Sequence, residues 1–595
     1  MFQHFDSILV LVVLLFIIIS LYREWIGPAF TFMVAVVTFG VAGILTPSEM
    51  LAGFANEQIA VILLLLLLGD TIRKTGVLEN FFNWIFSRAG TYNGFLWRMM
   101  GIVSVLSAFL NNTPLVAILM PYVHNWSKRH KIAPSKLLIP LSYAAILGGC
   151  ATLIGTSTNL IVNGLVTDQQ ITTDLRELNI FDFSLIGFPM IIVGILYMLL
   201  LGKHLLPNRH DVMASFSNKH RKYLVEAEVV PGSKLCNKTI EEAGLRNLEG
   251  LFLAEIYREG QKLTAVGPNT RLRGNDILIF AGATETIADM IKTDTGLRLT
   301  QVGMFSRKKH TAIREIVISH NSTLVGKTLK EARFRGKYDA AIIAVHRNGQ
   351  RISGKLGSIE LQAGDVLLLL AGQDFAARAV DTMDFYPITK VRDFTKQPAW
   401  KNITLIGGMA LAILLSVLGV VKLFIALLLL LLVIIIAGII NPKDIAKSLD
   451  YNLAVIIALA LALGTAMVKS GVAEAIAAFF IQYLQPFGII GVMFGIYLVT
   501  SFLSAYITNK AAVAIIFPIA LTMALDLGVN PLPFVLLVSF AGAASFITPV
   551  GYQTNLMVYG PGSYSFKDYM KVGLPLTIIY MFATVFGLAL IYNLF

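Results

Sequence analysis

Charged residues are scarce in this chain of 595 residues, because Asp, Glu, Lys and Arg together make up only 14% of it. Soluble domains carry about a quarter. Apolar residues reach 56%, and a soluble surface of that composition would aggregate. The scarcity of charge therefore excludes an ordinary soluble domain and predicts a protein that spans a lipid bilayer.

Cysteine is almost absent too. The two cysteines are Cys150, in an apolar stretch, and Cys236, in a polar region, so a disulfide framework is excluded.

The polar middle of the chain lacks the GxGxxG, Walker lysine, HExxH and GxSxG motifs, which gives an enzymatic role little support. The formal net charge is +12, but the basic residues do not form one stripe, so nucleic-acid binding is not expected.

The apolar part of the sequence occurs twice. LLLLLLGDTIRKTGVLE (63–79) returns as LALALGTAMVKSGVAE (459–474), and FLNNTPLVAILMP (109–121) returns as YITNKAAVAIIFP (506–518). IGTSTN (154–159) returns as VGYQTN (550–555). Repeated halves whose hydrophobic segments are interrupted by Gly and Pro at corresponding places are typical of secondary transporters.

The apolar runs predict an all-α polytopic membrane protein with an inverted repeat, about five spans plus one re-entrant hairpin per half, and an inserted pair of cytosolic α+β modules. An odd number of crossings gives the second half the opposite sense. The expected domains are 1–207, 208–300, 301–400 and 401–595. The expected spans are 7–22, 28–45, 58–73, 137–166 (interrupted) and 184–206, then 402–420, 422–440, 452–469, 533–560 (interrupted) and 570–594. The expected hairpins are 94–126 and 487–525, each preceded by an interfacial stretch, 78–90 or 471–484.

Lysine and arginine placement predicts the orientation. Basic residues gather in segments that share one side of the membrane if the amino terminus is outside, whereas the opposite loops 46–57, 167–180 and 526–532 hold a single Arg. The positive-inside rule then places both termini outside, the polar insert in the cytoplasm and the protein in the cell membrane. The run at 7–22 has no Lys or Arg before it, so we expect a retained span rather than a cleaved signal peptide.

The polar insert contains a repeat of its own. KLCNKTIEEAGLR (234–246) parallels TLVGKTLKEARFR (323–335), and Asp276 parallels Asp365 before an apolar strand. Short β-branched runs and Gly/Asn-Asp turns predict one small α+β module used twice. We interpret the pair as regulatory.

Irregular backbone at membrane depth survives only where it lines a cavity or holds an ion. NNTP (111–114) and TNK (508–510) are two such places, and we expect Asn112 or Thr113 to cap the returning helix at the first one. Freed carbonyls and Asn, Ser and Thr oxygens suit a sodium-sized cation, whereas N-H groups at helix starts suit an anion. The pattern predicts cation-coupled anion transport. The alternative is that these residues only satisfy broken helices and pack the bundle.

Two ionisable residues are weighed separately. Lys510 is placed deep in the bilayer, where its counterpart is Thr113. Its ammonium either takes the place of a coupling sodium, touches the substrate anion, or snorkels from a shallow tip. Asp70 ends a span and is interpreted as interfacial, which leaves no obvious buried carboxylate and disfavours proton antiport.

These residues resemble the divalent anion/sodium symporter (DASS) family of the ion transporter superfamily, in the branch that carries two TrkA-C (RCK-C type) domains. The family's Ser-Asn-Thr hairpin-tip motif is similar to Asn111-Asn112-Thr113 and to Thr508-Asn509-Lys510. The resemblance implies an elevator transporter, usually a homodimer, with TrkA-C domains that sense a cytosolic ligand. Members with this domain layout resemble sulfate transporters, so a dianion, with sulfate favoured, is the expected substrate.

The resemblance also implies two sets of site residues. The sodium set is Asn112, Thr113, Gly155, Thr156 and Asn159 in the first half and Asn509, Thr548, Gly551 and Asn555 in the second. The substrate set is Asn111, Asn112, Thr113, Ser157, Thr158, Thr508, Asn509, Lys510, Gln553 and Thr554. Lys510 replaces a family threonine, so we expect one sodium site, with Lys510 as the alternative to a second sodium. An arsenite-type or cation/proton antiporter of the same superfamily and a transporter-like sensor are the other functions considered.

Overall fold

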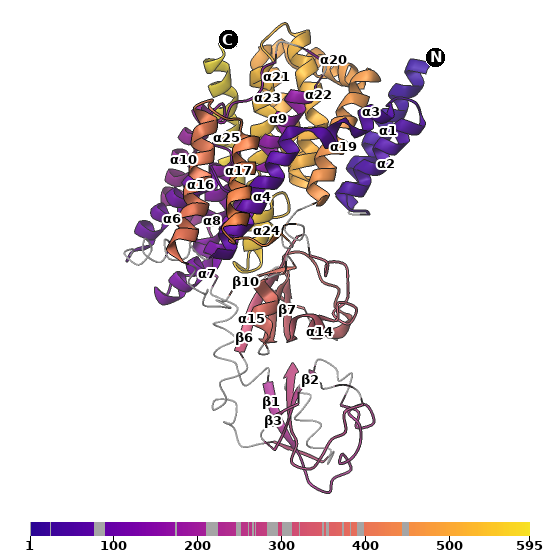
Figure 1. Ribbon diagram of the computed structural model, residues 1–595, viewed down its shortest axis with the longest axis vertical. Helices are drawn as coiled ribbons and strands as arrows, with labels where there is room; N and C mark the ends of the chain where they lie inside the picture. Colours follow the sequence, from indigo (N-terminus) through magenta and orange to yellow (C-terminus); the bar gives the residue numbers. More distant parts are fainter. Residues whose placement is uncertain are drawn as a thin grey trace.

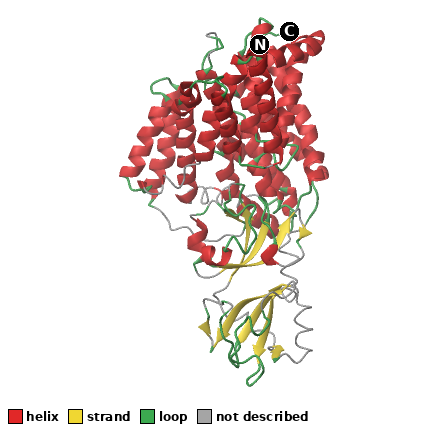
Figure 2. Cartoon of the chain, turned by 90° about the vertical axis from the view of Figure 1, so that its right-hand side faces the viewer, coloured by secondary structure: helices red, strands yellow, loops and turns green. Residues whose placement is uncertain are grey.

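A helical part and two β-sheets form the computed structural model of the chain, with both termini at the end of the helical part that lies away from the sheets (Figures 1 and 2). The structure describes residues 2–594 except 24, 76–81, 83–89, 170, 173–174, 210–223, 246–250, 260, 264–266, 268, 283–295, 300–311, 321, 348–349, 353–355, 372–373, 381, 383, 389–397, 443–444 and 446–450.

The first half of the helical part follows the predicted order of segments. Its helices are α1 (Phe2–Arg23), α2 (Pro28–Val41), α3 (Pro47–Ala52), α4 (Glu57–Thr75), α6 (Tyr92–Ser107), α7 (Asn112–Arg129), α8 (Leu138–Gly149), α9 (Ser157–Asp168), α10 (Ser184–Tyr197), a π-helical turn (Met198–Gly202) and α11 (Lys203–Leu205). The interfacial stretch expected at 78–90 lies, apart from Phe82 and Gly90, outside the described residues.

The second half repeats that order. Its helices are α16 (Ala399–Val417), α17 (Leu423–Ile436), α19 (Tyr451–Lys469), α20 (Val472–Leu484), α21 (Gly488–Tyr506), α22 (Asn509–Asp526), α23 (Leu532–Ala543), α24 (Gln553–Tyr559) and α25 (Phe566–Ile591). Both expected interrupted spans are broken, α8 from α9 and α23 from α24, because Gly-rich and Thr-rich loops separate them. The re-entrant course of the hairpins and the inversion of the two halves stay predictions.

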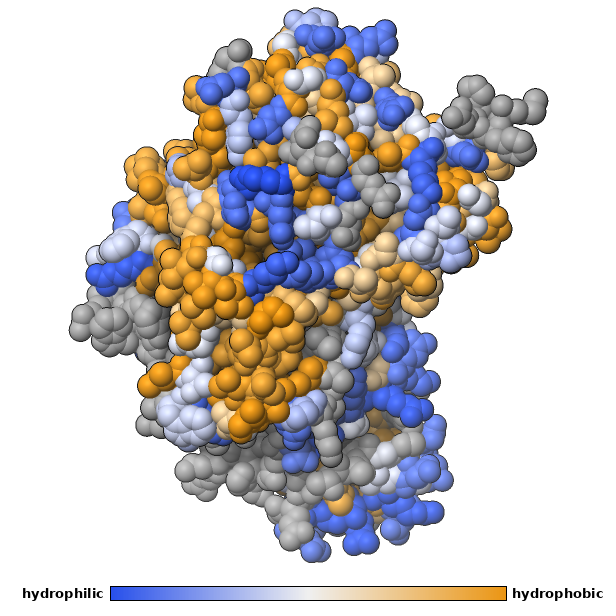
Figure 3. All heavy atoms as spheres, turned by 45° about the horizontal axis from the view of Figure 1, so that its top comes forward, coloured by the Kyte–Doolittle hydropathy of each residue, from blue (hydrophilic) through white to orange (hydrophobic). Residues whose placement is uncertain are grey.

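The outer helices carry apolar side chains on their surface. Seven helical segments among the described residues are long and apolar enough to cross a membrane, and apolar atoms cover much of the helical part (Figure 3). Exposed examples from five helices are Val37, Leu196, Ile403, Phe502 and Leu590. A water-soluble protein does not expose apolar patches of this size, so this is a multi-pass membrane protein.

The interior of the bundle is formed by the segments in which the binding residues were predicted. The apolar window of α22 (Asn509–Asp526) is 83% buried, whereas that of the outer helix α16 is 22% buried. All residues of α8 and α23 are buried as well. The hairpin arm and the broken helices therefore lie at the centre, with the other helices around them.

The insert contains two five-stranded antiparallel sheets and, in its second half, the short helices α14 (Phe334–Tyr338) and α15 (Phe375–Val380). The first contains β1 (Leu224–Val229), β2 (Leu251–Arg258), β3 (Gln261–Lys262), β4 (Ile277–Gly282) and β5 (Leu297–Leu299), in the order β3-β2-β4-β1-β5. The second contains β6 (Ala312–Ile318), β7 (Ala340–Arg347), β8 (Gln350–Arg351), β9 (Val366–Ala371) and β10 (Phe385–Pro387), in the order β10-β6-β9-β7-β8. Read from the other edge, the second order is the same as the first, so one topology occurs twice.

The same buried ion pair occurs in both sheets. Arg258 binds both carboxylate oxygens of Asp276 at 2.8 Å, and Arg347 binds those of Asp365 at 2.8 Å. Both aspartates are buried, and a buried carboxylate is tolerated when it is paired in this bidentate way. The repeat read from the sequence of the insert is thus present in its structure. The identity of the modules as TrkA-C domains stays a prediction.

Candidate functional site

Two helix starts and two helix breaks meet inside the bundle. The hairpin tips lie between α6 and α7 and between α21 and α22, and the breaks lie between α8 and α9 and between α23 and α24. Asn111 caps α7 by accepting from the backbone N-H of Thr113 at 3.0 Å, and Thr508 caps α22 by accepting from Ala511 at 3.3 Å. The expectation that Asn112 or Thr113 would be the cap is wrong, because both residues are already helical.

The first tip and the first break are joined by side-chain hydrogen bonds. Ser107 donates to Oδ1 of Asn112 and to the carbonyl of Ala145 (2.8 Å). Thr152 accepts from the backbone N-H of Gly155 at 3.2 Å, and its own carbonyl accepts from Nδ2 of Asn159 at 2.8 Å. These bonds gather neutral oxygens around the tip of the first hairpin.

The second half repeats this arrangement residue for residue. Ser504 donates to Oδ1 of Asn509 and to the carbonyl of Gly542, both at 2.8 Å. Thr548 accepts from the backbone N-H of Gly551 at 3.0 Å, and its carbonyl accepts from Nδ2 of Asn555 at 3.1 Å. Two separate parts of the sequence therefore build the same small structure.

Reciprocal bonds tie each broken helix to the other half. Ser142 of α8 donates to Oδ1 of Asn555 at 2.7 Å and to Thr554 at 2.8 Å. Ser539 of α23, at the corresponding position of the second half, donates to Oδ1 of Asn159 at 2.8 Å. Since each half completes the other, the two groups of oxygens form one connected cluster.

A further connection joins the second half to the first tip. The phenol of Tyr552 accepts from Nδ2 of Asn112 at 2.6 Å and lies 3.1 Å from the hydroxyl of Thr156. Beside it, Thr113 donates to the side-chain oxygen of Gln553 at 3.0 Å. Two side chains of the second half, Tyr552 and Gln553, therefore bind residues of the first tip.

Most of the predicted sodium set lies in this cluster. Asn112, Thr156, Asn159, Asn509, Thr548 and Asn555 are buried, each exposing 8% or less of its surface. The two glycines of the set also lie within it, because a Cβ on Gly155 would be 2.9 Å from the carbonyl of Ser107 and one on Gly551 would be 2.8 Å from Oγ1 of Thr548. Backbone at these positions packs too closely for any side chain.

The predicted substrate set is less uniform. Thr158 and Thr554 are buried, and Thr158 lies across from Gly542 of the other half. Six others are partly buried, Asn111, Thr113, Ser157, Thr508, Lys510 and Gln553. Lys510 occupies the first turn of α22, next to Asn509.

A pocket opens at the first tip. It encloses about 350 Å³ of empty space, counting its open mouth. Asn111, Gly155 and Ser157 line it, together with apolar residues of α4, α9 and α16. The lining of this pocket is mostly apolar, with a few polar groups from the first tip and the first break.

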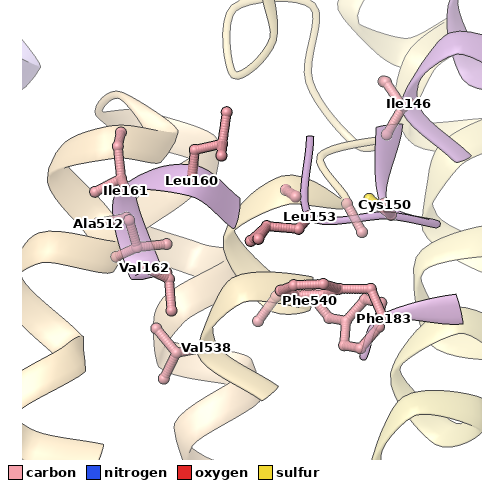
Figure 4. Close-up of a cluster of buried hydrophobic side chains, with 14 of the residues drawn as sticks. Ile146, Cys150, Leu153, Leu160, Ile161, Val162, Phe183, Ala512, Val538 and Phe540 are labelled. Carbon is pink, nitrogen blue, oxygen red and sulfur yellow. The ribbon is translucent and has the colours of Figure 1, made fainter. Parts of the chain in front are cut away.

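Apolar packing holds the broken helices in place beside the polar cluster. Ile161 and Val162 of α9 lie near Ala512 of α22 and Val538 of α23 (Figure 4). Phe183 packs edge-on against Phe540 of α23, with 5.4 Å between the ring centroids. Contacts of this kind fix the polar groups without adding charge to the site.

Asp70 is buried on α4, where 9% of its surface is exposed. Helix α4 packs against the interior helices α7 and α9, and the interfacial position of Asp70 stays a prediction. The expectation that the bundle holds no buried carboxylate is wrong, because Asp70 is one.

A family model described as "Citrate transporter" (CitMHS) matches residues 11–509 and 490–594 of the chain. The chain belongs to this citrate transporter family. Similar proteins include an uncharacterized transporter of Synechocystis, 32% identical over 98% of this chain and 97% of that protein, and a putative sulfur deprivation response regulator of Chlamydomonas reinhardtii, 33% identical over 91% and 94%. Probable sodium/sulfate cotransporter 3 of the same alga is 26% identical over 93% and 85%.

These matches confirm the resemblance at the level of an anion-transporter family. The Synechocystis protein and cotransporter 3 are named as transporters, as are two additional sodium/sulfate cotransporters of the same alga, whereas the 33% identical protein is named as a response regulator. This protein is therefore a membrane transporter of the citrate transporter family. Its relatives include proteins that are named as sodium/sulfate cotransporters.

Sequence reasoning missed six polar residues of the cluster. They are Ser107, Ser142, Thr152, Ser504, Ser539 and Tyr552. The serines could have been found, because each pair occupies matching positions in the repeat, Ser107 and Ser504 both standing five residues before the asparagine they bond. Tyr552 could not have been found this way, since its counterpart in the first half is the smaller Thr156.

Proposed function

We propose that this protein is a secondary active transporter that couples sodium entry to the uptake of a divalent oxyanion, with sulfate favoured. The observation that carries the proposal is the connected cluster of neutral oxygens built twice, around Asn112 and around Asn509, and joined by reciprocal bonds from Ser142 and Ser539. Transporters with repeated halves bind solute and coupling ion where broken helices of both halves meet. The names of the relatives support sodium and sulfate.

The oxygens of the first half suit sodium. Asn112, Ser107 and the carbonyl of Ala145 present neutral oxygen atoms close together, and a hard monovalent cation prefers such ligands. We place one sodium here, with Thr113, Gly155, Thr156 and Asn159 around it. The coupling ion then gains affinity from groups that are already held in position.

The second half differs by one charge. Lys510 stands where the first half has Thr113. Its ammonium group provides, at a fixed position, the positive charge that a second sodium ion would otherwise provide. A fixed charge beside the start of α22 favours a dianion between the two tips. The remaining substrate contacts fall to Asn111, Ser157, Thr158, Thr508, Gln553 and Thr554.

The surrounding assembly follows from the same proposal. The termini and the insert lie at opposite ends of the molecule (Figure 1), which agrees with termini outside the cell membrane and a cytoplasmic insert. The outer helices would form the scaffold of a homodimer. The central helices would carry the site across the bilayer in an elevator movement, under control of the insert.

Uptake by liposomes that contain the purified full-length chain tests the proposal. An inward sodium gradient should drive labelled sulfate above its equilibrium level, and an equal potassium gradient should not. Asn112→Ala should abolish this uptake, whereas Asn402→Ala should not, because Oδ1 of Asn402 has no hydrogen-bond partner among the described residues.

Three results would contradict the proposal. Uptake that follows a proton gradient and is lost in Asp70→Asn would favour an antiporter. Uptake of citrate or succinate without competition from sulfate would reassign the substrate. Binding of sulfate without flux would favour a sensor.

A further inference from the structure

The second sheet of the insert contacts the transport site directly. The module formed by residues 312–388, called module two below, presents the turn at Gly364 to α24. A Cβ on Gly364 would lie 3.0 Å from Cδ1 of Leu556, and one on Gly560 would lie 2.7 Å from the carbonyl oxygen of Gly364. Gly560 therefore packs on the backbone of Gly364, and Gly364 packs on the side chain of Leu556, so a Cβ at either glycine would have to displace its neighbour.

Beside this close contact, a small pocket lies between module two and the part of α24 that leads to the site. Ile318, Ser319, His320 and Tyr386 of module two form a pocket with Gln553, Leu556 and Met557, which encloses about 270 Å³ of empty space counting its mouth. Gln553 is the residue that binds Thr113 at the first tip. A helix of seven residues is about 10 Å long, so one short rod joins module two to the proposed binding site.

Apolar side chains join module two to the membrane bundle. Each module has a separate core of its own. In module two, however, Val317, Val366 and Ile388 belong to the same buried core as the transmembrane helices, and Cγ2 of Val366 would lie 2.6 Å from a Cβ on Gly560. No described residue of the first module (residues 224–299) belongs to that core.

Comparison of the modules shows why residue 364 is glycine. The equivalent residue of the first module is Asn275, in the same turn and with a similar positive φ, 67° against 84° for Gly364. Both backbone N-H groups bond the equivalent strand end, Val229 for Asn275 and Ile318 for Gly364. Asparagine therefore suits the turn itself, and the space left by glycine serves the contact with Leu556.

We propose that module two is a brake on the transporter, which it applies by holding α24 and thereby keeping Gln553 against Thr113. A contact made in one conformation stabilises that conformation at the expense of the others. Movement of the site requires α24 to leave its place, so the contact slows each cycle. The effect on flux rests on the proposed function, whereas the holding of α24 does not.

Two variants release the brake from opposite sides of the contact. Gly364→Asn places a side chain against Leu556 and keeps the turn, as Asn275 does in the first module. Gly560→Ala leaves module two unchanged and pushes against Val366. Gly336→Ala is the matched control, because no atom lies within 4 Å of a Cβ at this position of module two.

Hydrogen exchange of the full-length protein measures the hold without any substrate. Amides of residues 553–559 should exchange about tenfold faster in both variants than in the wild type and the control. Exchange that is unchanged in both variants would overturn the proposal. If only Gly364→Asn fails to fold, Gly560→Ala decides the matter.

Uptake in liposomes then measures the brake. The two variants should take up sulfate at least about threefold faster under a sodium gradient. Faster exchange with equal or slower uptake would overturn the brake, because the contact would then only support the site. If the wild type transports no sulfate, the proposed function fails, but the exchange result still shows whether module two holds α24.

Discussion

Nδ2 of Asn112 donates a 2.6 Å hydrogen bond to the phenol of Tyr552, although 440 residues separate them in the sequence. Because the nitrogen of the amide is engaged there, its oxygen faces Ser107 and the other oxygens of the first tip. The two tips are therefore not equivalent, since the first is oriented by a side chain from the second half.

Tyr552→Phe should weaken sodium binding. The substitution removes the bond to Asn112 and the contact with Thr156, each worth about 1 kcal/mol, so we expect half-maximal uptake at up to about thirtyfold more sodium. A sodium titration of sulfate uptake checks this. Tyr497→Phe is the control, because that hydroxyl has no partner among the described residues. An equal response of both variants would contradict the role of Tyr552.

Lys510→Thr should change how uptake depends on sodium. With the ammonium removed and the first-half residue type restored, a second sodium becomes necessary, so the titration should become steeper and the rate at low sodium should fall. Lys567→Thr, at an exposed position of α25, provides a control for loss of charge. Unchanged rate and sodium dependence in Lys510→Thr would indicate a lysine that only reaches toward the membrane surface.

Ser539→Ala and Ser142→Ala should destabilise the bundle to a similar extent. Each leaves a buried asparagine oxygen, of Asn159 or Asn555, without the serine hydroxyl it accepts from, at a cost of about 1–2 kcal/mol. Thermal unfolding in detergent measures this. Thr584→Val should have little effect, because the hydroxyl of Thr584 is buried without a partner among the described residues. A loss as large in Thr584→Val would argue against specific bonds between the halves.

Asp384→Asn should destabilise module two in a pH-dependent way. Burial by itself raises the pKa of Asp384, but hydrogen bonds from Lys337, Tyr338 and Thr323 outweigh it and lower the pKa to about 2 from 3.8. The charged carboxylate therefore contributes about 2 kcal/mol above pH 4, and this contribution is lost as the pH falls toward 2.

Protection of β6 amides against hydrogen exchange, corrected for the intrinsic rate at each pH, measures this contribution. The variant should be less protected than the wild type at pH 7, and the difference should shrink below pH 4. Asp374→Asn should have little effect, since its carboxylate is exposed and its 3.4 Å pair with Arg378 lies at the surface. A difference that does not depend on pH would contradict the assignment to charge.

The order of helices, the repeat of the halves and the positions of the breaks could be predicted, because each leaves a local mark in the sequence. A long apolar run marks a span, and Gly155 or Asn509 within such a run marks an interruption. The oxygen-rich tips could be nominated for the same reason. The bilayer core holds no water, so oxygen atoms at these tips must find partners within the protein or in a bound ion.

Partners from distant segments could not be predicted. Ser142 binds a residue 413 positions away, and neither residue's neighbours indicate the pairing. The burial of Asp70 depends on which face of α4 meets the interior, and the near-uniform leucine run before it carries no such information. The contact of Gly364 with α24 could not be predicted either, because it joins two segments, the insert and the second half, that are distant in the sequence.

A density map of the full-length protein with sodium and selenate, which has the shape of sulfate and a heavier centre, would show both proposed sites at once. Selenate should lie between the two hairpin tips, within contact distance of Thr113 and Lys510, and a smaller density should lie beside Oδ1 of Asn112. Selenate bound elsewhere, with Asn112 and Lys510 both remote from it, would rule out the proposed site.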